Sequence, residues 1–154
     1  GKRAVILNRP EIGQLGPEPL DPQFTLIRFK QLFACRKGGI KQMLMNPKFI
    51  AGIGNIYSDE ILYAAGIHPL SRLTKFQEPQ LKALYRSIKK VLKKAVRTRG
   101  TGIVGVSASA GTEQGYDKVR MVYQRRECPR GHEIQRIKIG GRSARFCPVE
   151  QKLF

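Results

Sequence analysis

Apolar residues recur at helical spacing in several segments of this 154-residue chain. Thr25 is placed to cap a helix whose apolar stripe consists of Leu26, Phe29, Leu32 and Phe33. The clearest helix begins at Pro79 and is expected to end at Gly100. One of its faces is apolar, and the opposite face is basic and interpreted as largely solvated. The basic residues of that face are Lys82, Arg86, Lys89, Lys90, Lys93, Lys94 and Arg97.

Shorter elements are expected between these two helices. Residues 40–45 fit a short helix, and Asn46-Pro47 predicts a second helix start, with a capping residue followed by proline. Another helical pattern begins at Ile56, with Asp59 and Glu60 in its first turns, where acidic residues favour the helix dipole. Gly66 is placed to end that helix.

A glycine turn leads into this central helix. Gly52 and Gly54 flank Ile53, so the backbone can bend sharply there and approach a ligand closely. Asn55 follows as a good N-cap. A helix start with free N–H groups behind a glycine turn is typical of an anion site. The same spacing also fits a plain helical corner in which the glycines allow close packing.

The C-terminal segment has the alternation of a β module. Residues 119–123 can form a strand, and residues 134–139 alternate apolar and polar side chains. Gly140-Gly141 predicts a two-residue hairpin turn before a return strand over residues 142–147. Arg142 is then the first side chain beyond the hairpin tip.

The predicted fold class is therefore mainly α with a small C-terminal β-hairpin module. A proline-rich connector at residues 16–22 is typical of a domain boundary, and residues 100–117 form a long loop rich in Gly, Ser, Ala and Thr. We predict a linker at 1–23, with a remnant of a strand near its start, a helical domain at 24–117 and the β module at 118–154.

Charge narrows the class of partner. The chain has 29 Lys and Arg against 11 Asp and Glu, a formal net charge of +18. The excess lies mainly in residues 71–154, which hold 20 basic and 6 acidic residues. This imbalance indicates a polyanion, in the first place nucleic acid. A basic membrane-surface protein is the alternative, but no separate amphipathic anchor stands out, and no apolar segment is long enough to span a bilayer.

Three cysteines are too few and too odd in number for a disulfide framework, which indicates an intracellular setting. Cys35 lies on a helical pattern and is interpreted as a small buried hydrophobe. Cys128 and Cys147 lie in the β module and are candidate metal ligands, which are considered below.

The central stretch resembles the helix–two-turn–helix motif of the formamidopyrimidine-DNA glycosylase and endonuclease VIII family of base-excision repair enzymes. The residues that match the motif are 51–57, Asp59-Glu60 and 66–69. Residues 15–20 match the sequence that connects the family's two domains. The resemblance implies a set of residues that hold DNA phosphates: Lys41, Gly52, Gly54, Asn55, Tyr123, Lys138 and Arg142.

The tail resembles the family's zinc finger, except that two of its four ligand positions lack cysteine. In one reading His132 and Glu150 substitute, and zinc is held by Cys128, His132, Cys147 and Glu150. In the other the hairpin folds on apolar contacts and binds no metal, as in the zincless members of this family. Both readings keep the hairpin and Arg142 at its tip.

The resemblance implies a parent DNA glycosylase and AP lyase that repairs oxidised bases by base flipping. It also implies that residues 1–23 are the end of a missing N-terminal catalytic domain and its linker. The family's catalytic N-terminal proline is not seen here, so this monomeric chain is expected to bind damaged or abasic duplex DNA without cutting it. We expect the chain to be cytoplasmic and associated with a bacterial nucleoid, or otherwise intracellular. The alternatives are a non-catalytic basic nucleic-acid-binding protein, similar to a small-subunit ribosomal protein with a related motif, or a degenerate glycosylase homologue.

Overall fold

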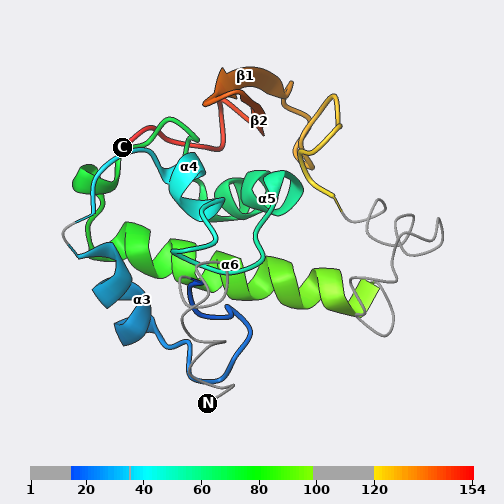
Figure 1. The fold of residues 1–154 in the computed structure, drawn as a ribbon. Coiled ribbons are helices and arrows are strands. Elements are labelled where there is room, and N and C mark those ends of the chain that lie inside the picture. The colour runs from blue at the N-terminus through cyan, green and yellow to red at the C-terminus, as the bar shows by residue number, and fades with distance from the viewer. Residues whose placement is uncertain (1–14, 35, 99–119) are drawn as a thin grey trace, which may run out of the picture.

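The computed structural model describes residues 15–34, 36–98 and 120–154. In this part of the chain a helical body carries a two-stranded hairpin, which confirms the predicted fold class (Figure 1). The elements are α3 (Leu26–Phe33), α4 (Ile40–Leu44), α5 (Asn55–Ala65), the 3-10 turn η1 (Leu73–Lys75), α6 (Glu78–Thr98), β1 (Gln135–Ile139) and β2 (Arg142–Phe146). None of these helices is long and apolar enough to cross a membrane.

Several predictions lie outside the described residues. They are the remnant strand near the N-terminus, the burial of Cys35, the closure of the long helix at Gly100 and the loop at 100–117. The proposed division at residues 23/24 and 117/118 stays a prediction.

The helices pack around one apolar core. Thr25 caps α3 as predicted, its hydroxyl accepting a hydrogen bond of 3.2 Å from the backbone N–H of Arg28. From α3, Phe29 lies edge-on or tilted against Phe24, Phe33, Phe49 and Tyr85, with ring centroids 4.9–6.4 Å apart. The long helix α6 packs along α5 through its predicted apolar face. The residues of α6 that are buried there include Leu84, Ile88, Val91, Leu92 and Ala95.

The central helix begins one residue earlier than predicted. Gly54, with extended backbone (φ −96°, ψ −169°), is the N-cap of α5, and Asn55 is already its first helical residue. The carbonyl of Gly54 accepts the first bond of the helix from the N–H of Ser58, at 3.0 Å. The prediction of Asn55 as N-cap is therefore wrong. Gly66 ends the helix in the left-handed conformation (φ 73°), as predicted.

Two further elements differ from the prediction. Asn46-Pro47 begins a turn rather than a helix, because the Asn46 side chain bonds the N–H of Lys48 and its carbonyl bonds the N–H of Phe49. The described part of the segment expected to be a strand, residues 120–123, is a bend. Its N–H groups are bonded by a side chain of α5 instead of a neighbouring strand, as described below.

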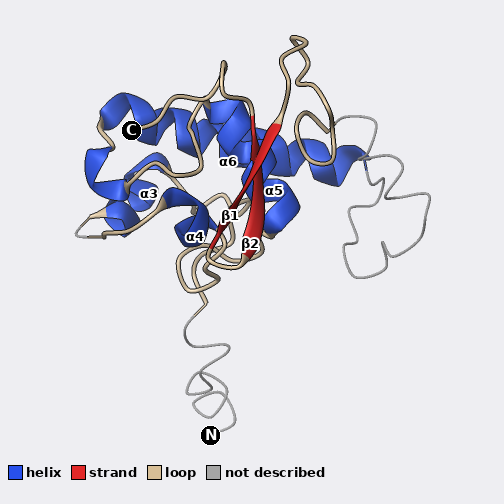
Figure 2. Ribbon diagram, turned by 90° about the horizontal axis from the view of Figure 1, so that it is seen from above, coloured by secondary structure: helices blue, strands red, loops and turns tan. Residues whose placement is uncertain are grey.

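The hairpin has the predicted turn. β1 and β2 pair antiparallel with Ile139 opposite Arg142, and Gly140 and Gly141 both have positive φ (57° and 81°), as a type I′ turn requires. Ala144 and Phe146 of β2 are buried, and β2 packs against α5. Seen from above, the hairpin crosses α5 while its turn extends past α4 (Figure 2).

Candidate nucleic-acid interface and metal cluster

The glycine turn before α5 presents its backbone to solvent. Gly52 and Gly54 are exposed, whereas Ile53 between them is only 5% exposed and anchors the turn in the core. Gly52 has φ +81°, a conformation that side chains rarely adopt, so a glycine is needed here by the fold itself. At Gly54 an added Cβ would meet no atom within 4 Å. The fold therefore does not explain why Gly54 is a glycine.

Lys41 lies beneath this turn, with only 1% of its surface exposed. Its ammonium group donates to the Asn55 carbonyl (3.3 Å), the Ser58 hydroxyl (2.7 Å) and the Asp59 carboxylate (2.6 Å). Burial lowers the pKa of Lys41 and raises that of Asp59, and the attraction between the two charges opposes both shifts. Lys41 therefore holds the start of α5 from inside.

The β1–β2 hairpin packs against α5 near Lys41. The charges of Arg145 and Arg142 are near enough to Lys41 to lower its pKa further, and the backbone and charge of Arg145 also act to lower the pKa of Asp59. The Arg142 side chain is exposed at the end of the hairpin, and Lys138 is exposed on β1, opposite Ser143. The structure thus places an exposed arginine on the strand that packs against α5, within electrostatic range of the lysine that holds the start of that helix.

Asn55 has an unusual environment for a helix start. Its side-chain oxygen is buried and has no hydrogen-bond partner among the described residues. An unsatisfied buried polar atom costs about 1–3 kcal/mol, so it calls for an explanation in terms of function or of a missing partner.

Tyr123 is held at the edge of this interface by α5. The Glu60 carboxylate, 1% exposed, accepts hydrogen bonds from the backbone N–H groups of Met121 (2.6 Å), Val122 (2.8 Å) and Tyr123 (3.0 Å). The guanidinium of Arg145 lies 4.7 Å from the centre of the Tyr123 ring. The ring is half-buried and packs under an arginine of β2.

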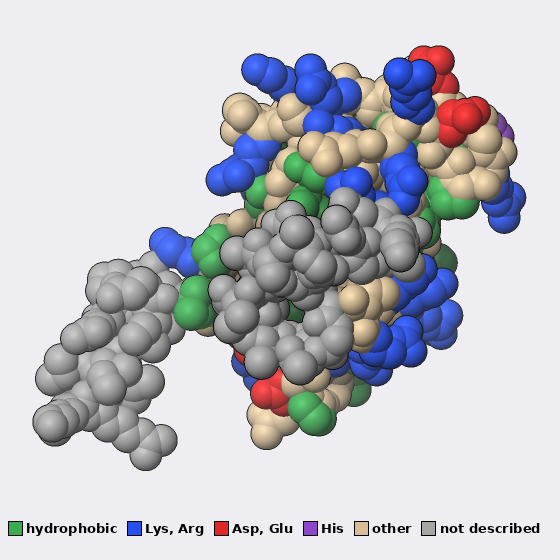
Figure 3. All heavy atoms as spheres, turned by 90° about the vertical axis from the view of Figure 1, so that its right-hand side faces the viewer, with side chains coloured by type: hydrophobic (Ala, Val, Ile, Leu, Met, Phe, Trp, Pro, Cys, Tyr) green, Lys and Arg blue, Asp and Glu red, His purple; other side chains and the backbone are tan. Residues whose placement is uncertain are grey.

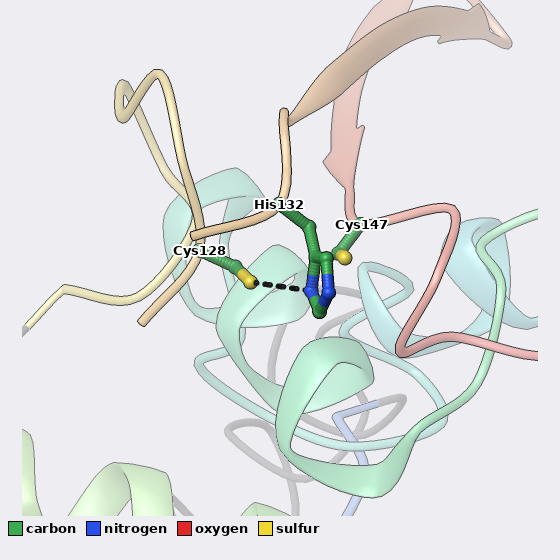
Figure 4. A group of neighbouring side chains, drawn as sticks. All are labelled: Cys128, His132 and Cys147. Atoms are coloured by element: carbon green, nitrogen blue, oxygen red, sulfur yellow. Dashed lines mark hydrogen bonds between the residues drawn. The ribbon is translucent and has the colours of Figure 1, made fainter. Parts of the chain in front are cut away.

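Three of the four predicted metal ligands come together. Cys128, His132 and Cys147 converge, and their ligand atoms all lie within 4.8 Å of one another (Figure 4). They form a cluster that could hold a metal ion. Glu150 is not among them: its carboxylate pairs with the Arg130 guanidinium at 2.9 Å.

The environment of the Cys128 sulfur favours its thiolate form. Burial raises the pKa of Cys128, but hydrogen bonds with His132, Arg130 and Tyr63 outweigh it and lower the pKa to about 6. Burial raises the pKa of Tyr63, as does its hydrogen bond to Cys128. The Cys147 sulfur accepts a hydrogen bond from the backbone N–H of Glu150 at 3.3 Å.

Sequence reasoning missed the buried polar residues that connect these parts. Asp59 and Glu60 were expected to favour the helix dipole from the first turns, yet they are 0% and 1% exposed: Asp59 pairs with Lys41, and Glu60 bonds backbone N–H groups of residues 121–123. Arg145 was not singled out at all. The signal available was the presence of two adjacent acidic residues in a segment otherwise rich in apolar residues.

A family model described as the formamidopyrimidine-DNA glycosylase H2TH domain matches residues 15–107. The chain belongs to this family. The chain is 38% identical over 148 residues to the formamidopyrimidine-DNA glycosylase of Protochlamydia amoebophila (strain UWE25). The aligned region covers 92% of this chain and 54% of that relative. The resemblance noted in the sequence is confirmed.

Solved structures similar to the H2TH chain include two DNA complexes of Lactococcus lactis Fpg. The complex with DNA that contains an abasic site has a TM-score of 0.78 and 35% identity, over 90% of this chain and 52% of that one. The complex with FAPY-dG-containing DNA has a TM-score of 0.77 and 35% identity, over 90% and 51%. The H2TH chain thus spans about half the length of the relatives it matches.

Proposed function

We propose that this chain is the DNA-binding part of a base-excision-repair DNA glycosylase, and that it holds damaged or abasic duplex DNA by its phosphates. The observation that carries this proposal is the convergence of exposed Arg142 with the glycine turn at the start of α5. A guanidinium near a glycine turn and a helix N-terminus suits an oxygen-rich anion. The relatives in DNA complexes support the same partner. We infer from this partner that the chain acts at a nucleoid.

The residues have different roles in this proposal. Gly52, Gly54, Asn55 and Arg142 contact phosphate, and Lys138 adds an exposed charge on β1. Tyr123 contributes to the edge of the contact surface. Lys41 acts indirectly, because its three donors are occupied by the start of α5.

Two substitutions test the proposal directly. Arg142→Ala and Asn55→Ala should each weaken binding to an abasic-site duplex by about 1–3 kcal/mol, the contribution of a charge-assisted hydrogen bond. Because both act on one phosphate cluster, the double variant should lose less than the sum. Fluorescence anisotropy with a labelled duplex measures this.

Arg86→Ala is the matched control, since Arg86 is an exposed arginine on α6. It should change the dissociation constant by less than twofold. Equal losses for Arg142→Ala and Arg86→Ala would contradict the interface.

For the cluster we propose zinc, held by Cys128, His132 and Cys147. Two thiolates and an imidazole are ligands that zinc prefers, and the backbone N–H bonds to both sulfurs give the outer support that such ligands usually have. Glu150 completes the set only if it leaves Arg130. Bound zinc would tie the turn at Cys128 to the end of β2 and so stabilise the module.

Zinc content can be measured on the purified chain by atomic absorption. One equivalent is expected, and Cys147→Ser should lose it together with thermal stability. Glu150→Gln should lose both if Glu150 is the fourth ligand and neither if it stays with Arg130. A metal-free chain whose melting temperature does not respond to chelator would overturn zinc binding.

A further inference from the structure

The long helix α6 has a strongly charged face that the proposed DNA interface does not use. Its single acidic residue, Glu78, lies in the first turn and pairs with Lys30. Burial lowers the pKa of Lys89, and the neighbouring charge of Lys93 lowers it further. Within residues 15–34, 36–98 and 120–154, the basic residues of α6 take part in no ion pair. They are Lys82, Arg86, Lys89, Lys90, Lys93, Lys94 and Arg97.

Part of this face is hollowed into an apolar groove. Leu20, from the segment before α3, and Val96 of α6 line it and are 37% and 36% exposed. Lys90, Lys93 and Arg97 line the same depression, whose volume is about 420 Å³. We refer to these five residues as the α6 groove. A ligand that fits this surface must meet two requirements: negative charges to pair with the three cations, and an apolar group to cover the two aliphatic side chains.

The α6 groove is separate from the proposed DNA interface. In Figure 1, α6 lies on one side of α5 and the β1–β2 hairpin on the other. Lys and Arg side chains gather in two areas in Figure 3, one over the hairpin module at the top and one at the lower right. The groove shares no residue with the glycine turn or the hairpin. A duplex held by Arg142 would therefore leave the groove open.

We propose that the α6 groove binds an acidic segment of a partner protein that carries an aliphatic or aromatic side chain. The carboxylates would pair with Lys90, Lys93 and Arg97, and the apolar side chain would cover Leu20 and Val96. Duplex DNA satisfies only the first requirement, because its backbone presents phosphates and sugars, and its bases are stacked inside. An amphipathic acidic peptide satisfies both.

The test uses two labelled peptides and the full chain. One peptide alternates Asp and Glu with two Leu residues, and the other has Ser in place of both Leu. Anisotropy at about 0.15 M salt should show roughly tenfold tighter binding of the leucine peptide, since burying apolar side chains favours binding and exposed charges are screened. Val96→Asp should abolish the difference between the peptides.

The charge requirement is tested on the same helix. Lys93→Glu with Arg97→Glu should weaken binding of the leucine peptide at least tenfold. The matched pair Lys82→Glu with Arg86→Glu makes the same change in net charge outside the groove, and should cost less than threefold. Circular dichroism of each variant checks that α6 is intact.

Three results would overturn the proposal. They are equal affinity for the two peptides, equal losses in the two charge-reversal pairs, and displacement of the peptide by a short undamaged duplex at its own binding concentration. The last result would make the groove a second nucleic-acid surface. These results do not depend on the proposed DNA interface, because Arg142 does not line the α6 groove. Arg142→Ala should therefore leave peptide binding unchanged, even if the proposed DNA interface is wrong.

Discussion

At the scale of single residues, Glu60 connects the helical body to the segment that leads into the hairpin module. One carboxylate bonds three successive backbone N–H groups that would otherwise be left unpaired near the core. Acceptance of two or three backbone N–H bonds by a buried carboxylate is a strong arrangement, because each bond is charge-assisted. The side chain thus takes the place of the strand partner that the sequence led us to expect.

Glu60→Gln should therefore destabilise the chain by about 1–3 kcal/mol, because the amide NH₂ group would face N–H donors and leave at least one unsatisfied. Urea unfolding followed by circular dichroism measures the change. Glu78→Gln is the control: Glu78 is half-exposed and pairs with Lys30 at the surface, a contact worth at most about 1 kcal/mol. An equal loss in both variants would show that the three bonds contribute nothing special.

The same residue shows why sequence reasoning stopped short. The cap at Thr25 and the left-handed Gly66 depend on residues within four positions, and both were predictable. Glu60 bonds residues 61–63 positions away. Periodicity along one element contains no information about such a partner, so the sequence offered only a helix-dipole role for Asp59 and Glu60 and did not predict their burial.

At the scale of elements, the two glycines of the turn before α5 serve different purposes: Gly52 is required by the fold, and Gly54 is proposed to serve DNA binding. Gly52 has positive φ, whereas Gly54 has an extended backbone and open space around it. Gly52→Ala should cost about 1–2 kcal/mol of stability from the strained backbone. Gly54→Ala should change stability by less than about 1 kcal/mol, since the lower entropy of the unfolded chain offsets a slightly poorer cap.

DNA binding, unlike stability, should be sensitive to a substitution at Gly54. A methyl group there would project into the space that a phosphate must enter, so Gly54→Ala should weaken binding to an abasic duplex at least tenfold while the protein stays folded. Thermal unfolding and anisotropy on the same preparation give both readings. Full affinity in Gly54→Ala would mean that the turn does not approach the phosphate.

Elements were predictable where local chemistry specifies them. The hairpin required only Gly140-Gly141 between alternating residues, and α6 required only its apolar stripe. The strand expected at 119–123 did not form in its described part, residues 120–123, because the backbone N–H groups there bond the Glu60 side chain and no described strand lies beside them. Of the four candidate metal ligands, Cys128, His132 and Cys147 lie together as one of the two sequence interpretations required, whereas Glu150 pairs with Arg130.

At the scale of the whole molecule, the net charge of +18 and the number of phosphate contacts are different quantities. Helix α6 lies on the other side of α5 from the β1–β2 hairpin (Figure 1), so we expect its seven cations to add to the long-range field without neutralising a phosphate at the proposed interface. The salt dependence of DNA binding distinguishes these contributions, because its slope counts the phosphates that are neutralised, at about −0.9 in log K per log salt for each.

Arg142→Ala and Lys138→Ala should each make this slope shallower by about 0.9, since each removes one cation that neutralises a phosphate. Arg86→Ala removes the same formal charge from α6 and should leave the slope unchanged, while slightly lowering the association rate at low salt. Titrations of a labelled abasic duplex between about 0.05 and 0.2 M salt give the slopes, and stopped-flow mixing gives the rates. If Arg86→Ala flattened the slope as much as Arg142→Ala, the duplex would have to contact both sides of α5. The separation of the hairpin interface from the α6 groove would then be wrong.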